Sequence, residues 1–470
     1  MALPLDLSPH DFQELAAAIV QRSAVFLGER PNAPAADFDG LDDLFTAIRL
    51  APPERGVDFE RVLDIAFQAG RKGHDTTGPG WLAYIPGGGL PSAALADLIA
   101  RVTNRFVTSW ETAPVMAEIE ATVIRWLCQL FGYGSTARGV LTTGGSLANF
   151  SAVVAARHSR LGERFQKGTI YVTSETHGSV AKAAVLAGFP RSAVRLLPVM
   201  GGLRMDAEAL KNLVKSDRSK GLMPFAVVAS AGTTNTGAVD PIGAIADVAE
   251  RDGLWLHVDA AYGGFFQLTK RGETLFSGID RADSITLDPH KGMFLPYGTG
   301  ALLVRDGQLL RAAHEVHGAY LQDLAPEHDI PNFSDYSAEL SRDSRGLRVW
   351  LPIQIHGLAA FRDALDEKLD LAQEAAAGLR TVPGIDVPWE PELSIVAFRL
   401  TKTEWAAPEL ATAELLRRLN ALRRFVLSST VVDGRFTIRI AILSFRTHRE
   451  RIEETINAIR TETARMLRGE

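Results

Sequence analysis

The sequence lacks several features that mark special classes of protein. Cys128 is its single cysteine, which excludes a disulfide within the chain, and its place in the amphipathic run 119–130 predicts a plain buried thiol. No apolar run reaches the roughly 18–20 residues that span a bilayer, so we expect no membrane segment. The first residues contain no basic stretch followed by an apolar one, which argues against a secretory signal. We therefore expect a cytoplasmic protein.

A strong charge of either sign is also absent. The formal net charge is −6, which gives no electrostatic reason to expect nucleic acid or an anionic membrane as a partner. With 470 residues, 46% hydrophobic and 23% charged, the composition is that of a globular protein that is too long for one ordinary domain. We find no internal repeat, no low-complexity tract and no pattern of residues that predicts a metal site.

The middle of the chain alternates short apolar runs with helical stretches. Several of the runs are rich in Val and Ile and have the length of strands, which is typical of a parallel sheet covered by helices on both faces. The sequence therefore predicts an α/β domain whose large, mostly parallel sheet has seven strands, at 139–141, 169–172, 193–197, 225–229, 254–258, 284–287 and 301–304.

The two ends of the chain follow other patterns. Residues 11–26 and 59–70 have apolar residues at helical spacing, but this segment has little material for a core of its own. After residue 351 a long helical stretch precedes strands and helices that indicate an α+β unit. We therefore divide the chain into a helical N-terminal segment (1–77), a large α/β domain (78–350) and a small C-terminal α+β domain (351–470).

The tetrapeptide Asp288-Pro289-His290-Lys291 follows the predicted strand 284–287 directly. Ligands of open α/β sheets bind beyond the carboxyl ends of the strands, and a lysine desolvated there loses its proton readily and can react as a neutral amine. A surface lysine on a loop is the alternative. Strand 254–258 similarly ends in Asp259, a buried acid that needs a cationic partner. The ring nitrogen of pyridoxal phosphate is one such partner, and a metal-binding or nucleotide-binding role is the alternative.

Two polar turns and a histidine follow other predicted strands. Gly144, Gly145 and Ser146 lead into a helix, where backbone N–H groups, the helix dipole and a hydroxyl favour an anion such as phosphate. A second turn, 231–237, contains Thr234, and each turn alone is equally consistent with a simple tight turn. His177 follows strand 169–172, where a lone histidine is more often structural.

The order of these motifs closely resembles the group II amino-acid decarboxylases, the pyridoxal-phosphate family of the aromatic-amino-acid and glutamate decarboxylases within fold type I. The resemblance covers residues 7–467 and includes the segments 109–114, 257–263 and 288–291. It implies the aspartate-aminotransferase-like fold, the cofactor pyridoxal phosphate, and an amino-acid substrate. It also implies a homodimer with shared active sites, in which the N-terminal segment clasps the second subunit.

The resemblance assigns roles to individual residues. Lys291 would hold the cofactor as a Schiff base, Asp259 would pair with its ring nitrogen, and His177 and Ala261 would lie on the two ring faces. Gly144, Gly145, Ser146 and Asp288 would surround the phosphate, Thr234 would lie near the ring, and His290 would line the site. Tyr320 matches the mobile-loop tyrosine, a candidate proton donor with His177 as the second. The substrate pocket would include Tyr84, Pro86, Phe106, His290 and Arg439, although the family pattern does not define the role of Arg439.

Some positions depart from the family pattern, and these put the substrate in doubt. Asp288 stands where many relatives have asparagine, Leu147 where many have glutamate, and Ile85 where aromatic decarboxylases often have phenylalanine. We expect decarboxylation of an L-amino acid to its amine, with an aromatic substrate slightly favoured. The alternatives are aldehyde-forming oxidative deamination, a carbon–carbon lyase reaction, an inactive cofactor-binding homologue and a structural scaffold.

Overall fold

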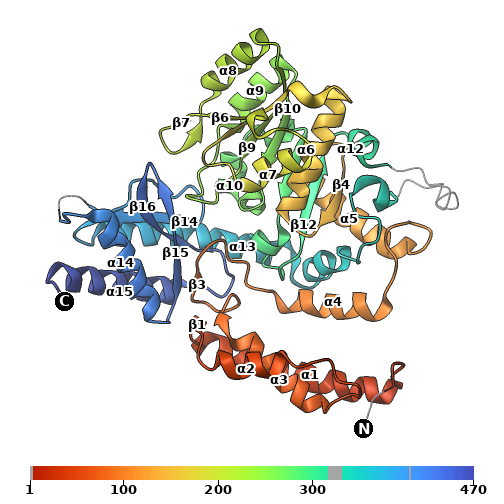
Figure 1. Cartoon of the computed structure of the whole chain (residues 1–470), viewed down its shortest axis with the longest axis vertical. Coiled ribbons are helices and arrows are strands. Elements are labelled where there is room, and N and C mark those ends of the chain that lie inside the picture. The colour runs from red at the N-terminus through yellow and green to blue at the C-terminus, as the bar shows by residue number, and fades with distance from the viewer. Residues whose placement is uncertain (1–3, 316–330, 402–403) are drawn as a thin grey trace.

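The computed structural model describes residues 4–315, 331–401 and 404–470 (Figure 1). Figure 1 shows a large sheet domain at the centre, a C-terminal domain to one side, and the N-terminal helices as an arm along the lower edge. None of the helices described is long and apolar enough to cross a membrane. The chain termini lie on opposite sides of the molecule in this view.

The central domain is built on a seven-stranded sheet with the order β4-β12-β11-β10-β9-β5-β6. Strand β12 is antiparallel to both of its neighbours and the other pairs are parallel, so six of the strands end at the same edge. The prediction of a mostly parallel seven-stranded sheet is confirmed. The strands are β4 (Arg138–Thr142), β5 (Gly168–Thr173), β6 (Val194–Leu197), β9 (Met223–Ser230), β10 (Trp255–Asp259), β11 (Ser284–Leu287) and β12 (Gly300–Val304).

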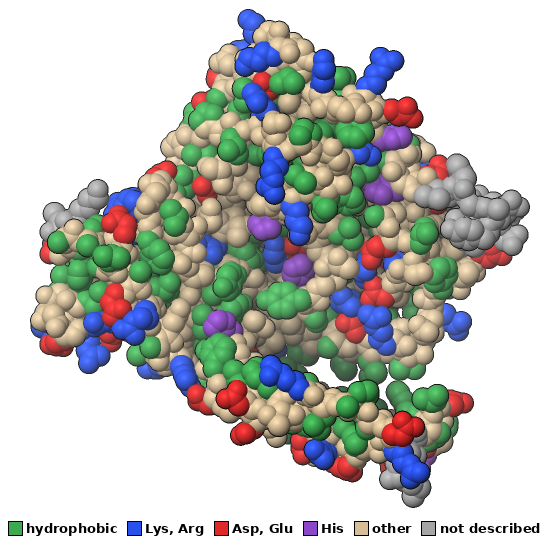
Figure 2. All heavy atoms as spheres, in the orientation of Figure 1, with side chains coloured by type: hydrophobic (Ala, Val, Ile, Leu, Met, Phe, Trp, Pro, Cys, Tyr) green, Lys and Arg blue, Asp and Glu red, His purple; other side chains and the backbone are tan. Residues whose placement is uncertain are grey.

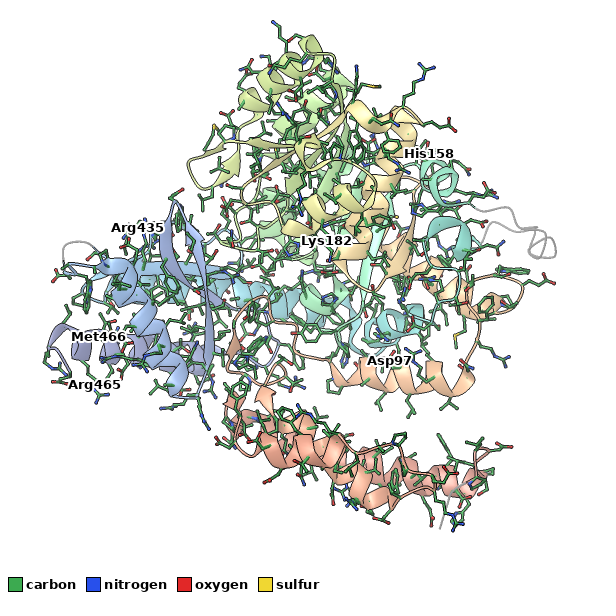
Figure 3. The ribbon with its side chains drawn as sticks, in the orientation of Figure 1. Asp97, His158, Lys182, Arg435, Arg465 and Met466 are labelled. Atoms are coloured by element: carbon green, nitrogen blue, oxygen red, sulfur yellow. The ribbon has the colours of Figure 1, made fainter. Side chains whose placement is uncertain are left out.

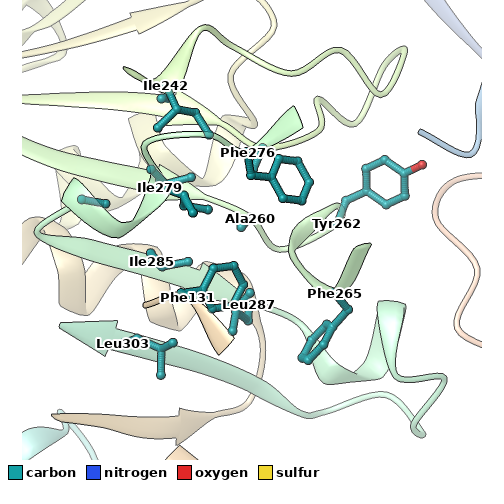
Figure 4. Packing of buried hydrophobic residues seen from close by; sticks show 14 of the residues in the cluster. Phe131, Ile242, Ala260, Tyr262, Phe265, Phe276, Ile279, Ile285, Leu287 and Leu303 are labelled. Atoms are coloured by element: carbon teal, nitrogen blue, oxygen red, sulfur yellow. The ribbon is translucent and has the colours of Figure 1, made fainter. Parts of the chain in front are cut away.

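Helices cover both faces of this sheet because its strands bury apolar side chains in both directions. Figure 4 shows the packing on one face, where Phe131, Ile242 and Leu287 lie in the same cluster. A second cluster on the opposite face joins Trp255 to apolar residues of α6, α7 and α12. The helices of this domain are α4 (Pro91–Thr103), α5 (Pro114–Leu130), α6 (Gly145–Leu161), α7 (Gly178–Leu186), α8 (Ala207–Ser219), α9 (Ile242–Asp252), α10 (Lys270–Leu275), α11 (Pro289–Gly292) and α12 (Gly307–His314).

The long helix α13 (Gly346–Arg380) connects the central domain to the C-terminal one. It is interrupted at Gly357, whose φ of 70° is accessible mainly to glycine. Its first turns are tied to α4 by Arg348, whose Nε donates to Asp97 Oδ1 at 2.7 Å; Asp97 is labelled in Figure 3.

The C-terminal domain packs a five-stranded sheet, in the order β13-β14-β16-β15-β3, against α13, α14 (Pro408–Ala421) and α15 (Arg449–Leu467). All of its strand pairs are antiparallel except β15 with β3. The α+β expectation for the tail is confirmed, but β3 comes from the other end of the chain and was not predicted. The strands are β3 (Trp81–Leu82), β13 (Ile385–Asp386), β14 (Ile395–Leu400), β15 (Val426–Val432) and β16 (Arg435–Ala441).

The N-terminal arm consists of α1 (Pro9–Glu29), α2 (Leu41–Ile48) and α3 (Phe59–Arg71). Helix α1 begins where the Ser8 hydroxyl accepts a hydrogen bond from the Asp11 backbone N–H at 3.1 Å. None of the residues of α1 is buried in the single chain, and Figure 2 shows hydrophobic side chains exposed along the arm. A short antiparallel pair, β1 (Ala36–Asp37) with β2 (Gly73–His74), joins two stretches of the arm, and Ala35 and Ala36 pack with Trp81 and Val426 of the body.

Candidate active site

A cavity of about 280 Å³ opens at the edge of the central sheet where the parallel strands end. Polar turns after β4, β5, β9, β10 and β11 meet there, as expected for loops that follow parallel strands. All ten residues predicted to bind the cofactor line this cavity: Gly144, Gly145, Ser146, His177, Thr234, Asp259, Ala261, Asp288, His290 and Lys291.

The turn between β4 and α6 forms one wall of the cavity. Helix α6 begins at Gly145, so the N–H groups of its first turn and its positive dipole end are suited to binding an anion in the cavity. A Cβ atom at Gly145 would lie 3.1 Å from both the Ala261 Cβ and the Asp288 Oδ2, which leaves little room for a side chain. The glycine therefore allows the backbone to pack against the turns after β10 and β11, and the Ser146 hydroxyl is exposed beside it.

Asp259 ends β10 and is buried, with 7% of its surface exposed. The side-chain amide of Asn149 donates to its Oδ2 at 2.9 Å, and the Ala261 N–H donates to its Oδ1 at 3.2 Å. Among the described residues no lysine or arginine is paired with this carboxylate, so its negative charge is available to a cationic group of a ligand. That is the environment expected for a carboxylate that pairs with a protonated ring nitrogen.

Lys291 lies one turn beyond the end of β11, and its Nζ forms an ion pair with Asp288 Oδ2 at 2.9 Å. The second carboxylate oxygen of Asp288 is buried and makes no hydrogen bond with any residue in the described part of the chain. The acid that departs from the family pattern is therefore turned toward the lysine. His290 donates from Nδ1 to the Thr299 carbonyl oxygen at 2.6 Å, and burial lowers the pKa of this imidazole.

His177 caps the N-terminus of α7 and lines the cavity with an exposed side chain. Its Nδ1 lies 2.7 Å from the Ser179 hydroxyl and accepts the Ser179 backbone N–H at 3.3 Å. These contacts with Ser179 hold the Nδ1 side of the imidazole, and Nε2 is the nitrogen that remains for a ligand. His177 is thus placed at the cavity by the capping turn of α7.

Arg439 does not line the cavity but holds the turn that does. It is 3% exposed, and it donates to the Asn235 carbonyl oxygen at 2.7 Å, to the Thr234 carbonyl oxygen, and to the Tyr84 carbonyl oxygen at 3.2 Å. Burial lowers its pKa to about 10. The contacts of Arg439 are those of a residue that joins the Thr234 turn to the segment that follows β3 at Tyr84, a role that the sequence did not predict.

Three other predicted substrate residues lie outside the cavity of the same chain. Tyr84 is 64% exposed, and Phe106 is 45% exposed beside a separate pocket. Pro86 is buried next to Gly87, where a Cβ would lie 2.0 Å from the His290 carbonyl oxygen. The segment therefore packs against the turn that carries Lys291. Tyr320 lies outside the described residues, so its role stays a prediction.

Several polar residues at the site were not selected from the sequence, and two of them contact the predicted residues Asp259 and His177. Asn149 lies on α6, four residues after Gly145, and Ser179 lies in the first turn of α7; both line the cavity. A polar residue one helical turn after a glycine turn, on the side that faces the sheet, is the signal that could have identified Asn149.

Comparison with known proteins identifies the family. Residues 68–401 match the model of the pyridoxal-dependent decarboxylase conserved domain. The chain belongs to this family. It is 32% identical to the aromatic-L-amino-acid decarboxylase of Bacillus atrophaeus over 98% of this chain and 97% of the relative. It is also 32% identical to the L-2,4-diaminobutyrate decarboxylase of Rhizobium meliloti (strain 1021), covering 92% of this chain and 85% of the relative.

The crystal structure of Oryza sativa TDC with PLP (pyridoxal phosphate) and tryptamine superposes with a TM-score of 0.92 at 26% identity, covering 99% of this chain and 100% of that one. The decarboxylase family, its fold and its cofactor, all inferred above from motifs, are thereby confirmed. The residues that line the cavity also fit pyridoxal phosphate. The cavity combines an anion-binding glycine turn, a buried unpaired carboxylate at Asp259 and a lysine amine at Lys291, three groups that the phosphate, ring nitrogen and aldehyde of the cofactor require.

Proposed function

We propose that this pyridoxal-dependent decarboxylase acts on an aromatic L-amino acid and releases the amine and CO₂. The observation that carries the proposal is the convergence of Lys291, Asp259, His177 and the glycine turn on one cavity. When bound, pyridoxal phosphate supplies a conjugated ring that accepts the electron pair left behind as CO₂ departs.

The side chains of the site have separate tasks in this proposal. Lys291 would hold the cofactor through its Nζ amine, at the position that the amine of the substrate would take in turn. Asp259 keeps the ring nitrogen protonated through its negative charge, an electrostatic effect that is commonly the largest contribution to catalysis. The glycine turn and Ser146 bind the phosphate, and Thr234 and Ala261 border the ring. Tyr320 delivers a proton to the carbon that lost CO₂, with His177 as the second candidate.

The charges at the cavity favour an aromatic over an acidic substrate. The acidic and basic side chains that line it are His177, Asp259, Asp288, His290 and Lys291, and all five are assigned above to the cofactor. Among the described residues that line the cavity there is no arginine to pair with a carboxylate on the substrate side chain. Leu147, where many relatives have glutamate, also lines the cavity and offers no negative charge to a second amine. An uncharged side chain fits this lining best.

The substrate is tested by incubating the purified enzyme with the standard amino acids and 2,4-diaminobutyrate, with CO₂, amine, aldehyde and hydrogen peroxide measured in the same samples. We expect tryptophan, tyrosine or phenylalanine to give amine and CO₂ in equal amounts. A preference for glutamate, aspartate or diaminobutyrate would contradict the proposed substrate class. Aldehyde and peroxide as the main products would instead assign the chain to oxidative deamination.

We further propose that the active unit is a homodimer with shared active sites. Helix α1 has no buried residue in the single chain, and α4 exposes Leu95, Leu98, Ile99 and Val102. Exposed apolar surface on two long helices is stabilised by burial against a second copy. The N-terminal segment 1–77 would then clasp the partner, and the exposed rings of Tyr84 and Phe106 would complete the partner's cavity.

Mixing of inactive variants tests the shared site. In a mixed dimer of Lys291→Ala and Phe106→Ala chains, one cavity receives Lys291 from one subunit and Phe106 from the other, so we expect activity to reappear on mixing and refolding. The matched control pairs Lys291→Ala with His177→Ala, whose side chains line the cavity of the same chain, and this mixture should stay inactive. A fully active monomer in sedimentation analysis would contradict the proposal. The cytoplasmic location stays a prediction from the sequence.

A further inference from the structure

A row of buried hydrogen bonds crosses strands β10 and β11 and reaches the candidate active site. The Trp255 indole Nε1 donates to Ser284 Oγ at 2.7 Å, and Ser284 Oγ lies 2.8 Å from His257 Nδ1. On the other side of the imidazole, His257 Nε2 lies 3.0 Å from Asn149 Oδ1. All four side chains are buried, and Trp255, Ser284 and His257 do not line the cavity.

The row branches at Asn149. Its Nδ2 donates to Asp259 Oδ2 and to Ser179 Oγ, both at 2.9 Å, and Ser179 Oγ lies 2.7 Å from His177 Nδ1. The Asn149 amide therefore contacts Asp259 directly. It contacts His177 through the Ser179 hydroxyl. Asn149 is 1% exposed, so water does not compete for these bonds.

The carboxylate end of the row fixes the direction of the hydrogen bonds at Asn149 and His257. An indole N–H only donates, so Ser284 Oγ must accept from Trp255, which leaves its own proton free to donate to His257 Nδ1. At the other end an ionised carboxylate only accepts, so the NH₂ group of Asn149 faces Asp259 and its oxygen faces His257. His257 Nε2 must then carry a proton. The Asn149 end therefore sets the neutral tautomer of the buried imidazole, and the Trp255 end is compatible with it; Thr286 Oγ1, 3.4 Å from Nε2, can also accept from this N–H.

The hydrogen bonds of the branch determine which nitrogen of His177 carries the proton. The Ser179 hydroxyl accepts from Asn149 and donates to His177 Nδ1, and the Ser179 backbone N–H, which cannot reverse, donates to the same nitrogen. Because Nδ1 accepts two hydrogen bonds, the proton of the neutral ring resides on Nε2. Among the described residues none accepts a hydrogen bond from this Nε2, so its N–H is presented to whatever occupies the cavity.

We propose that Trp255, Ser284, His257 and Asn149 are positioning residues that orient the Asp259 carboxylate through the Asn149 amide and keep His177 with its proton on Nε2. The roles of Asp259 and His177 in turnover rest on the proposed function. The proton positions themselves follow from the protein alone and do not depend on the cofactor. The row thus orients one carboxylate and one N–H donor at the cavity, both through the Asn149 amide.

Nitrogen NMR of protein labelled with ¹⁵N-histidine tests the proton positions directly, with and without pyridoxal phosphate. Signals of His257 and His177 are assigned by their loss in His257→Gln and His177→Gln. We expect both rings to show a protonated Nε2 and an unprotonated Nδ1 near neutral pH. A proton on Nδ1 of either ring, or averaging of the two nitrogens of His257, overturns the proposal.

Ser284→Ala tests whether the distant end of the row matters to the site, since Ser284 lies outside the cavity. A hydrogen bond of this kind is worth about threefold to tenfold in an equilibrium. We expect the affinity for pyridoxal phosphate and kcat each to fall by about that factor and KM to stay the same, while His257 keeps its proton on Nε2, which the Asn149 end still sets. Ser284→Cys, with similar volume and a weaker donor, should give a smaller loss and guards against misfolding.

The matched control is Thr169→Val, which removes a buried hydroxyl bonded to Tyr171 on strand β5, apart from the row. It should leave the cofactor affinity and both tautomers unchanged. Equal losses in the control, or wild-type behaviour of Ser284→Ala, would contradict a positioning role. An active Lys291→Ala variant would instead contradict the proposed function while leaving the tautomer measurement intact, so the two failures are distinguishable.

Discussion

The two faces of strands β10 and β11 differ in kind. Toward α5 and α9 the strands present Leu256, Val258, Ile285 and Leu287, which pack in the apolar cluster of Figure 4. Toward α6 the same two strands present, at alternate positions and equally buried, Trp255, His257, Asp259, Ser284 and Thr286.

The difference shows which residues serve the fold and which serve the site. Burial of apolar side chains is the main stabilising force of a domain, which accounts for the apolar residues on the side that faces α5. Burial of imidazole, hydroxyl and carboxylate groups costs free energy unless each is hydrogen-bonded, and a fold could use apolar residues there instead. We therefore expect changes on the α6 side to lower activity, and changes on the α5 side to lower stability.

The largest loss of activity should follow substitution of Lys291, which lies just beyond the end of β11. We expect Lys291→Ala to reduce turnover by more than about 10⁴-fold, because the amine that binds the cofactor is lost. The free energy of unfolding should change little, since the side chain lies at the cavity and not in the core. Steady-state kinetics and urea unfolding of the same preparation measure both quantities.

The control for this prediction is Lys182→Ala. Lys182 is exposed on α7, where Figure 3 labels it, and its loss should leave turnover unchanged. Near-normal activity of Lys291→Ala would end the assignment of this lysine to the cofactor.

The second prediction concerns Asp259, within the polar side. Asp259→Asn keeps the volume of the side chain but removes the negative charge, so we expect kcat to fall by about 10²–10³-fold and cofactor binding to weaken. The matched control is Asp217→Asn, a buried carboxylate paired with Arg195 and Tyr171 at the other side of the sheet. The control should lose stability and retain kcat; similar kcat losses in the two variants would show that any buried charge matters equally.

The sequence predicted the sheet and the cavity for related reasons. Buried parallel strands have continuous apolar runs, so β10 and β11 could be recognised, and functional residues follow their ends, so Asp259 and Lys291 could be placed at one edge. Two-residue strand β3 has no periodicity to recognise, and α2 lies in a stretch rich in Pro, Ala and Asp.

The positioning row could not be derived from the sequence. It depends on the register that sets His257 opposite Ser284 and on the packing of α6, which brings Asn149 over the sheet. Neither is a local property of the chain. The same holds for Arg439, whose partners Thr234 and Tyr84 are more than two hundred residues away in sequence.

The third prediction tests the apolar side. Leu256→Ala leaves a cavity in the packed cluster, and we expect it to lower the free energy of unfolding by about 2–5 kcal/mol. At 25 °C the kcat of the folded enzyme should be unchanged, because Leu256 points away from the α6 side. The exposed Leu410, with 74% of its surface accessible, is the control, and Leu410→Ala should cost less than about 0.5 kcal/mol. A fall in kcat without a loss of stability in Leu256→Ala would remove the distinction between the two faces.

The smallest expected effect is the pH dependence that His257 confers on stability. Burial lowers the pKa of this imidazole below its ordinary value of 6.5, although the neighbouring Asp259 acts in the opposite direction. The unfolded chain therefore binds a proton more readily than the folded one. The stability contributed by the neutral ring is fully present above pH 6.5 and is lost as the pH falls from there toward the folded pKa, by at most about 1.4 kcal/mol per pH unit.

The measurement is the free energy of unfolding of wild type and His257→Gln between pH 7.5 and 5. Glutamine does not titrate, so the variant should be less stable than wild type at pH 7.5, and the difference should shrink as the pH falls. His10→Gln, at an exposed position of α1, should reduce the slope by less. Parallel curves for wild type and His257→Gln would show that the buried imidazole takes up its proton in both states alike, and the polar side of the sheet would then lack the fixed neutral histidine on which the row depends.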